Sequence, residues 1–264
     1  MCTSHPRLCS ELTLEFAKFG VGVHRPVSLA HAVSLAAWFR QRASMVQRLT
    51  IRWHEDMADG VPLSPLLLCA MPKLHTLWVQ FHSRGWDMVD LPQLWPLQYL
   101  TGLTDLQISG GLKDFYGGRG RMAALPWLAP LAQLRSLRLS GMHLLPPAVE
   151  ALRSLSAVTS VEVRISEDAG QAFPASLACL SELSTLTLSL AAGVDLAAAS
   201  MTGLACLTCV ELSELQLDGE TGPIIQGLST LPALEQLSLG RCDFDAEVGV
   251  HCRQGRPCLW EPGN

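Results

Sequence analysis

Two cysteines, Cys206 and Cys209, are separated by the two-residue gap that redox-active and zinc-binding pairs share. Redox chemistry would require the pair at the start of a helix that follows a strand, and a tetrahedral zinc site would require a second pair of ligands. His251, Cys252 and Cys258 could supply that second pair, but their spacing differs from that of a zinc ribbon. The alternative is that both cysteines act as small core residues. The repeat register described below favours the core alternative.

Two other motifs could take part in ligand chemistry. The glycine-rich segment 117–120 lacks the Gly-Lys-Ser/Thr ending of a phosphate-binding loop, and we interpret it as a flexible insertion. His54 and His82 follow two strands at equivalent positions, where a metal or pH-switch role is conceivable, but exposed turn histidines are the simpler interpretation. Paired carboxylates, a nucleophile elbow and His-x-x-x-His spacing do not occur in the sequence. We therefore predict no enzymatic activity, no cofactor and no metal ion.

The composition is apolar but does not predict a membrane protein. Of the 264 residues, 48% are hydrophobic and 16% are charged, and the mean hydropathy is +0.25. The excess is leucine and alanine at fixed spacing, and no uninterrupted apolar run approaches the roughly 18 residues that span a bilayer. The net charge of −5 argues against nucleic acid or an anionic membrane as a partner.

Cysteine and asparagine usage indicate the compartment. The nine cysteines are odd in number and scattered without a disulfide framework, which favours a reducing environment. Asn264 is the only asparagine, so the sequence contains no N-glycosylation site. The first residues also lack the apolar segment of a signal peptide. We therefore predict an intracellular, cytoplasmic protein.

Leucine spacing defines the elements that must position any site. The clearest phrase has apolar residues three apart and then two apart, at Leu128, Leu131, Leu134, Leu137 and Leu139. A step of three places a stripe on a helix or 3₁₀ segment, and a step of two predicts a strand. The phrase recurs at steps of about 22–31 residues, which predicts a solenoid. The first strand residues are Leu49, Leu77, Leu106, Leu137, Val161, Leu186, Leu215 and Leu237.

The seventh repeat allows two registers. One uses Leu204 and Leu207 and begins the strand at Val210, whereas the other places Cys206 and Cys209 on core positions and begins the strand at Leu215. We favour the second register, because the phrase 212–219 parallels the phrase 103–110 residue by residue. It predicts that the outward residues of this strand are Glu214, Gln216 and Asp218.

Other features divide the chain. Residues 1–35 are predicted to form an N-terminal cap with a possible ninth strand at Leu12-Thr13-Leu14, residues 36–244 the array, and residues 245–264 an irregular tail. Residues 147–155 are predicted to form a helix with proline in its first turn. Residues 110–121 are predicted to form a surface loop. Glycines at 110, 141, 219 and 240 follow strands and release the chain into the return segment.

The outward strand residues are the predicted binding face. Because strand leucines point into the core, the residues between them face the concave side, where acidic and basic types balance. Arginine and tryptophan, the types that dominate interface energetics, gather near the N-terminal end. Partial cover of Trp78 by the N-terminal cap is the alternative. The predicted partner-binding residues are Arg48, Arg52, Trp53, Trp78, Gln80, Phe81 and Arg138.

Over residues 36–244 these phrases resemble intracellular leucine-rich repeat proteins. The resemblance implies an α/β fold: a horseshoe solenoid of about eight to nine repeats, with parallel strands on the concave face and helices or 3₁₀ turns on the convex face. The family places Asn or Cys a few residues after each strand, whereas this chain has types such as His54, Met142 and Ser166 there. The departure leaves the regularity of the curvature open.

The segment 5–16 resembles the end of an F-box that leads into its first repeat, with Cys9 where the family has an aromatic residue, and residues 36–42 resemble the helix that opens such arrays. The F-box itself would precede Met1, so binding to a ligase adaptor is not expected for this chain. The resemblance implies a protein-interaction scaffold that acts through its concave face, including substrate recognition for a ubiquitin ligase. A structural role in a cytoskeletal or axonemal assembly is the alternative.

Overall fold

The computed structural model describes the strands of the array and most of the segments that join them. The described residues are 10–16, 42–54, 71–82, 92–110, 120–122, 125–166, 169, 173–190, 204–213, 216–217, 228, 231–240, 243–244 and 258–260. Most of the opening helix expected at 36–42, most of the 110–121 insertion and most of the C-terminal tail lie outside these residues.

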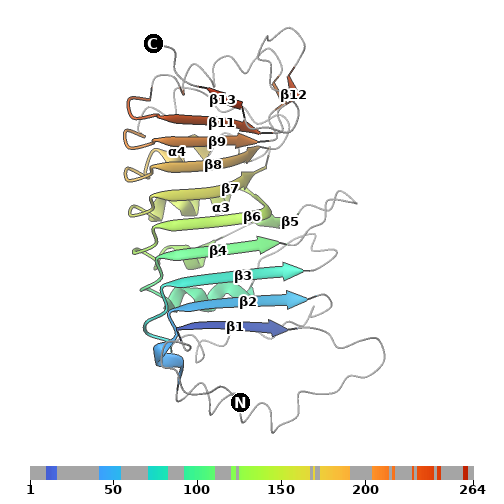
Figure 1. The fold of residues 1–264 in the computed structure, drawn as a ribbon, viewed down its shortest axis with the longest axis vertical. Helices are drawn as coiled ribbons and strands as arrows, with labels where there is room; N and C mark the ends of the chain where they lie inside the picture. The colour runs from blue at the N-terminus through green and yellow to red at the C-terminus, as the bar shows by residue number, and fades with distance from the viewer. Residues whose placement is uncertain are drawn as a thin grey trace, which may run out of the picture.

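Among the described residues, nine strands form one continuous parallel sheet, in which each strand pairs with its nearest neighbours along the chain (Figure 1). Equivalent repeat positions pair directly, as in Leu49 with Leu77 and Leu77 with Leu106. The predicted leucine-rich repeat solenoid is therefore confirmed, including its ninth strand. The nine strands are β1 Glu11–Phe16, β2 Arg48–His54, β3 Thr76–His82, β4 Asp105–Gly110, β6 Ser136–Leu144, β7 Ser160–Ile165, β8 Thr185–Leu190, β9 Cys209–Ser213 and β11 Gln236–Gly240.

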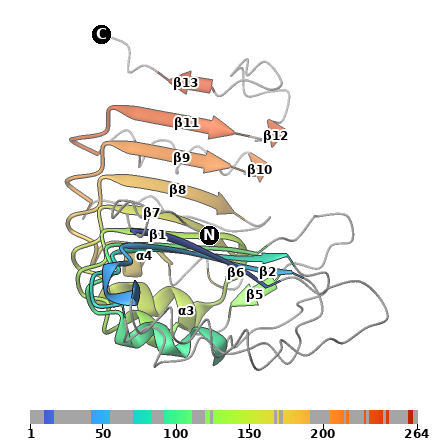
Figure 2. The same ribbon diagram turned by 60° about the horizontal axis from the view of Figure 1, so that its bottom comes forward.

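The Leu-x-x-Leu segments form tight turns. In each turn a backbone N–H donates to the carbonyl three residues earlier, as from Leu103 to Leu100 and from Leu134 to Leu131. Because 3₁₀ geometry repeats every three residues, both leucines of a turn point into the core. Short helices return the chain on the convex side of the sheet (Figure 2). They are η2 Ala43–Met45, η3 Pro92–Tyr99, η5 Pro126–Leu128, α3 Pro146–Ala151, η6 Leu152–Ser154 and α4 Phe173–Leu177.

The core runs as a single cluster between the sheet and these turns. Its leucines are almost fully buried, and Leu106, Leu137 and Leu186 are at most 1% exposed. Full burial of one leucine side chain contributes about 1.5–3 kcal/mol. The helix predicted at 147–155 is present as α3 followed by η6, and it buries Val149 and Leu152 in the same cluster. None of the described helices is long and apolar enough to cross a membrane.

The seventh repeat differs from the register that we favoured. Its strand β9 begins at Cys209, and Leu204, Leu207, Val210 and Leu212 occupy the core positions, each 0% exposed. The observed register is the more stable one because it buries leucine and valine side chains, whereas the register that we favoured would bury two smaller cysteines in their place. The predicted core role of the cysteines is wrong: Cys206 is exposed and Cys209 is half-buried.

Hydroxyl side chains link neighbouring repeats at the corner that precedes the strands. Four of them, two residues before the first core residue of their strands, donate to the backbone carbonyl at the preceding repeat's equivalent position, over 3.0–3.1 Å. The same carbonyls also accept two successive backbone N–H groups of the next repeat. We call these residues the hydroxyl ladder; they are Thr104, Thr159, Ser184 and Thr208.

On the side of the strands where the family has its Asn or Cys, a described polar residue also makes a cross-repeat bond. Ser166 follows β7, is buried, and donates from its hydroxyl to the carbonyl of Leu144 over 2.7 Å. The hydroxyl ladder therefore makes its cross-repeat bonds at the opposite corner from the one where the family pattern places its polar residue. The paired register of the strands is regular even though the family's asparagines are absent from the sequence.

Strand β6 contains an irregularity at Gly141. This residue has a φ of 75°, and the register between β6 and β7 shifts between Leu139 and His143. A Cβ at Gly141 would collide with the backbone carbonyl of Gly110 at the end of β4. Beyond the shift, the end of β6 pairs with β5 Gly120–Met122, which was expected to be part of a loop.

The described part of the tail is a strand. The short strand β13 Cys258–Trp260 pairs antiparallel with β11 and covers the C-terminal edge of the sheet, so these three residues are not irregular as predicted. A second, two-stranded sheet pairs β10 Gln216–Leu217 with β12 Asp243–Phe244. Part of the seventh repeat strand that we predicted to begin at Leu215 therefore belongs to this outer pair, as β10.

Candidate functional site

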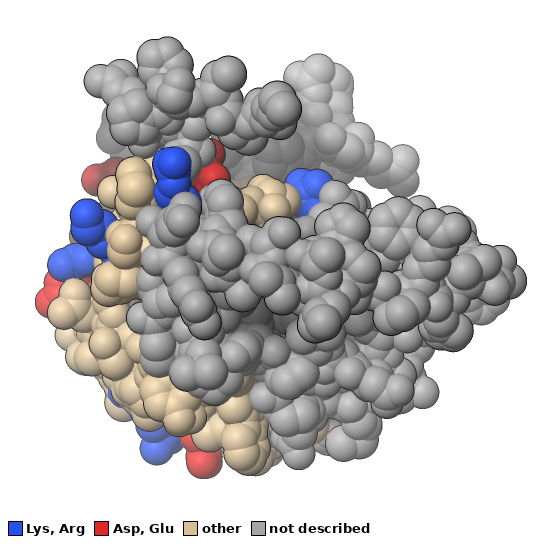
Figure 3. Space-filling model, turned by 90° about the horizontal axis from the view of Figure 1, so that it is seen from below, with Lys and Arg blue, Asp and Glu red and all other residues tan. Residues whose placement is uncertain are grey.

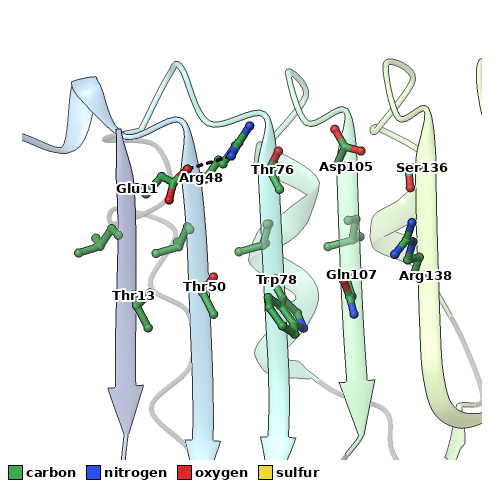
Figure 4. A pocket seen from close by; sticks show the side chains of 14 residues that line it. Glu11, Thr13, Arg48, Thr50, Thr76, Trp78, Asp105, Gln107, Ser136 and Arg138 are labelled. Atoms are coloured by element: carbon green, nitrogen blue, oxygen red, sulfur yellow. Dashed lines mark hydrogen bonds and ion pairs between the residues drawn. The ribbon is translucent and has the colours of Figure 1, made fainter. Parts of the chain in front are cut away.

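The outward residues of the first five repeat strands form two rows on the concave face. The rows arise because successive strands pair without a shift, so equivalent side chains stand side by side. Figure 4 shows the first row near the start of the strands and the second row one outward position further on. The first row is Glu11, Arg48, Thr76, Asp105 and Ser136, and the second is Thr13, Thr50, Trp78, Gln107 and Arg138.

These rows line an open groove of about 460 Å³ across β1, β2, β3, β4 and β6. Trp78 is a half-buried aromatic side chain among the polar residues of its row. Its indole N–H is buried and has no hydrogen-bond partner in the described structure. An unsatisfied buried donor costs about 1–3 kcal/mol, so a group that accepted this hydrogen bond would gain free energy.

Ion pairs organise most of the charge in and beside the groove. The guanidinium of Arg48 lies 2.8 Å from the carboxylate of Glu11, and that of Arg138 lies 3.9 Å from that of Glu162. Ser140 also donates to Glu162 over 2.8 Å. Because these arginines and acids remain 38–67% exposed, each pair contributes at most about 1 kcal/mol. Figure 3, which looks at the molecule from below, shows basic and acidic side chains interspersed among the described residues.

The structure brings together five of the predicted partner-binding residues. Arg48, Trp78 and Arg138 line the groove. Arg52 and Gln80 occupy the next outward row, where the Arg52 Nε donates to the Gln80 amide oxygen over 3.0 Å. Their half-buried side chains extend the same face beyond the groove.

The other two predicted partner-binding residues, Phe81 and Trp53, are not among the described side chains of the concave surface. Phe81 is only 5% exposed and belongs to the core, so it is not part of the concave surface. The prediction placed it beyond the strand, whereas β3 continues to His82 and its alternation turns Phe81 inward. Trp53 pairs with Phe81 in the sheet, and its side chain lies outside the description, as do the side chains of His54 and His82.

Sequence reasoning missed several groove residues. Glu11 and Thr13 come from β1, and the ninth strand at Leu12 and Leu14 already marked their positions. Asp105 lies in the first row of β4; the alternation predicted that it faces outward, but it was not among the predicted partner-binding residues. Its half-buried carboxylate lies 2.8 Å from the Thr104 hydroxyl, which also has the His75 carbonyl within 3.0 Å and can donate its single hydrogen to only one of the two at a time.

The corrected register changes the C-terminal half of the face. Strand β9 presents Cys209, Glu211 and Ser213 in place of the predicted Glu214, Gln216 and Asp218. Burial, and to a lesser extent the negative charge of Glu211, raise the pKa of the Cys209 thiol. A raised pKa disfavours the thiolate that nucleophilic or metal chemistry needs. The described residues contain no group of three or more potential metal ligands.

Comparison with known proteins assigns no family to this chain. No family model and no curated protein matches the chain. Among 40 matching chains of solved structures is the Arabidopsis receptor kinase HAESA LRR ectodomain, in complex with an N-terminally extended IDA peptide hormone ligand. The sequence identity is 18% and the TM-score 0.44, and the match covers 75% of this chain and 29% of that chain. The fold assignment therefore rests on the strand register and the turns described above.

Proposed function

We propose that the protein is an interaction scaffold that binds a protein partner in the groove across β1 to β6. One observation carries the proposal: tryptophan and arginine gather on this half of the concave face. Further along the same rows, β8 presents Thr185 and Thr187. Interface hot spots are enriched in tryptophan and arginine and depleted in threonine and serine.

Affinity purification with mass spectrometry tests this proposal. Wild-type chain should capture one or more proteins that Trp78→Ala and Arg52→Ala variants lose. Thr187→Ala, on the second row of β8, is the matched control and should retain them. Equal capture by wild type and by the Trp78→Ala and Arg52→Ala variants would overturn the proposal, provided that circular dichroism shows all variants folded.

A finer proposal is substrate recognition for a ubiquitin ligase. Its support is the resemblance of residues 5–16 to the end of an F-box, of which β1 forms the last part. The partner would then be a substrate, and adaptor binding is not expected from the groove itself. An in-frame F-box in the upstream transcript would support this role. A stop codon there, or co-purification with filament proteins and localisation on filaments, would favour the cytoskeletal or axonemal alternative.

An intracellular location is part of the same proposal. The described cysteines include Cys206, which is free and has an exposed side chain. Exposed thiols persist in a reducing compartment and oxidise readily outside one. Fractionation of cells that express a tagged chain tests the location, and recovery from the secreted fraction would contradict it.

A further inference from the structure

We propose that the groove contains a subsite for a long cationic side chain, a lysine or arginine of the partner, formed by Trp78 and Asp105. The proposal deepens the proposed function and rests on it. Asp105 begins β4 beside Thr76, and Trp78 lies one outward position further along the adjacent strand β3. The two residues are therefore diagonal neighbours on one face of the sheet (Figure 4).

Charge complementarity indicates a cation. The two arginines of the groove each have an acidic partner: Arg48 pairs with Glu11, and Arg138 pairs with Glu162. Among the residues that the structure describes, Asp105 makes no ion pair, and its carboxylate has only the neutral hydroxyl of Thr104, which it shares with the His75 carbonyl, as a hydrogen-bond donor. The described groove therefore retains one unpaired negative charge on a half-buried side chain. A partner ammonium or guanidinium would neutralise it with a charge-assisted hydrogen bond.

The geometry selects a long side chain. Strands lie about 4.8 Å apart and same-face positions about 6.6 Å apart, so the two Cβ positions are roughly 8 Å apart. Figure 4 shows the carboxylate of Asp105 near the start of its strand and the indole of Trp78 further along. Lysine and arginine have apolar stems that pack on aromatic surfaces while the charged end reaches a polar group. Such a stem would lie on Trp78 and place its charged end at Asp105.

An acidic ligand is the opposing possibility, because the groove also holds two arginines. It would compete with Glu11 for Arg48 or with Glu162 for Arg138, and these exposed pairs are weak. The test must therefore compare cationic ligands with anionic ligands as well as with neutral ones.

The experiment is an NMR titration of the full-length ¹⁵N-labelled chain, followed at the indole N–H resonance of Trp78. A Trp78→Phe variant assigns that resonance among those of the seven tryptophans. The probes are Nα-acetyl-arginine amide, Nα-acetyl-lysine amide, the neutral isostere Nα-acetyl-citrulline amide and Nα-acetyl-glutamate amide. We expect saturable shifts with the arginine and lysine probes, and at least tenfold weaker binding of citrulline and glutamate.

Two variants, each of which replaces one carboxylate by the corresponding amide, test the role of Asp105 and provide its control. Asp105→Asn should weaken binding of the arginine probe at least tenfold, and Glu211→Gln, on the distant strand β9, should leave it unchanged. Equal binding of citrulline, tighter binding of glutamate, or undiminished binding by Asp105→Asn would each overturn the subsite. So would the absence of a saturable shift with both cationic probes.

Capture of cellular partners separates this proposal from the proposed function. If Trp78→Ala loses a partner that Asp105→Asn retains at equal affinity, the groove binds protein but the cationic subsite is wrong. If the arginine probe binds through Asp105 while Trp78→Ala retains every captured protein, the subsite exists but the scaffold proposal fails.

Discussion

Among the glycines that the structure describes, Gly141 is the one whose backbone most restricts substitution. Its positive φ favours glycine, and the neighbouring carbonyl of Gly110 occupies the space that a side chain would need. The glycine thus allows β6 to shift its register and to pair with both β5 and the end of β7.

We expect Gly141→Ala to lower the free energy of unfolding by about 2 kcal/mol or more, since the left-handed conformation alone costs about 1–2 kcal/mol. Gly102→Ala is the control, because a Cβ there meets nothing within 4 Å. It should change the free energy by less than about 0.5 kcal/mol. Urea denaturation measures both, and equal effects would contradict the role of Gly141.

Cys209 should react slowly with alkylating reagents at neutral pH. Its raised pKa shifts the thiolate to higher pH, and Glu211→Gln removes one of the two causes. The rate–pH profile of Cys209 alkylation, followed by mass spectrometry, should therefore move to lower pH in that variant. Because the folded pKa is above the unfolded one, the unfolded chain loses the proton first, and stability should fall as the pH rises through the unfolded pKa. An unchanged profile in Glu211→Gln would contradict the contribution of the carboxylate.

The hydroxyl ladder is the element-scale feature that joins one repeat to the next. Thr208→Val retains the shape of the side chain but removes the bond to the carbonyl of Ser184. We expect a loss of about 0.5–1.5 kcal/mol in the free energy of unfolding. Thr187→Val, an outward residue of β8, is the matched control and should change it little. Equal destabilisation by the two variants would show that the ladder bond contributes nothing specific.

Predictability also differs from element to element. Leucine spacing predicted the strands and turns of seven repeats, because only those positions can bury an apolar stripe. At the seventh strand the likeness between 212–219 and 103–110 misled us, since part of that phrase pairs with β12 outside the main sheet. The ladder could not have corrected the error, because Thr208 and Ser213 provide a hydroxyl two residues before the first core residue in either register.

The site was less predictable than the fold. Outward positions follow from alternation, so Arg48, Trp78 and Arg138 were found from the sequence. The partners of a charged residue depend on rotamers and on neighbouring strands, which spacing does not reveal. The pairing of Arg48 with Glu11 therefore emerged only in the structure, as did the contrast with Asp105.

One core cluster runs through the repeats of the molecule. The loss of stability from truncating a core leucine should therefore depend on whether its strand is central or at an edge. Leu137 lies in a central strand and is 0% exposed, whereas Leu12 lies in the edge strand β1 and is only partly buried. Leu137→Ala should cost about 2–5 kcal/mol, and Leu12→Ala clearly less. Urea denaturation followed by circular dichroism measures both, and equal losses would contradict a stability set by neighbouring repeats.

The unshifted register of the strands has a consequence for any extended partner that crosses them. The concave face repeats its side chains about every 4.8 Å, whereas an extended chain repeats one side-chain direction about every 6.8 Å. Three strand spacings of about 4.8 Å nearly equal two side-chain repeats of about 6.8 Å, so the two periods coincide about every third strand. In the second row, Thr50 on β2 and Arg138 on β6 are three strands apart. An extended segment in phase with one of these strands is therefore nearly in phase with the other, and out of phase with the two between.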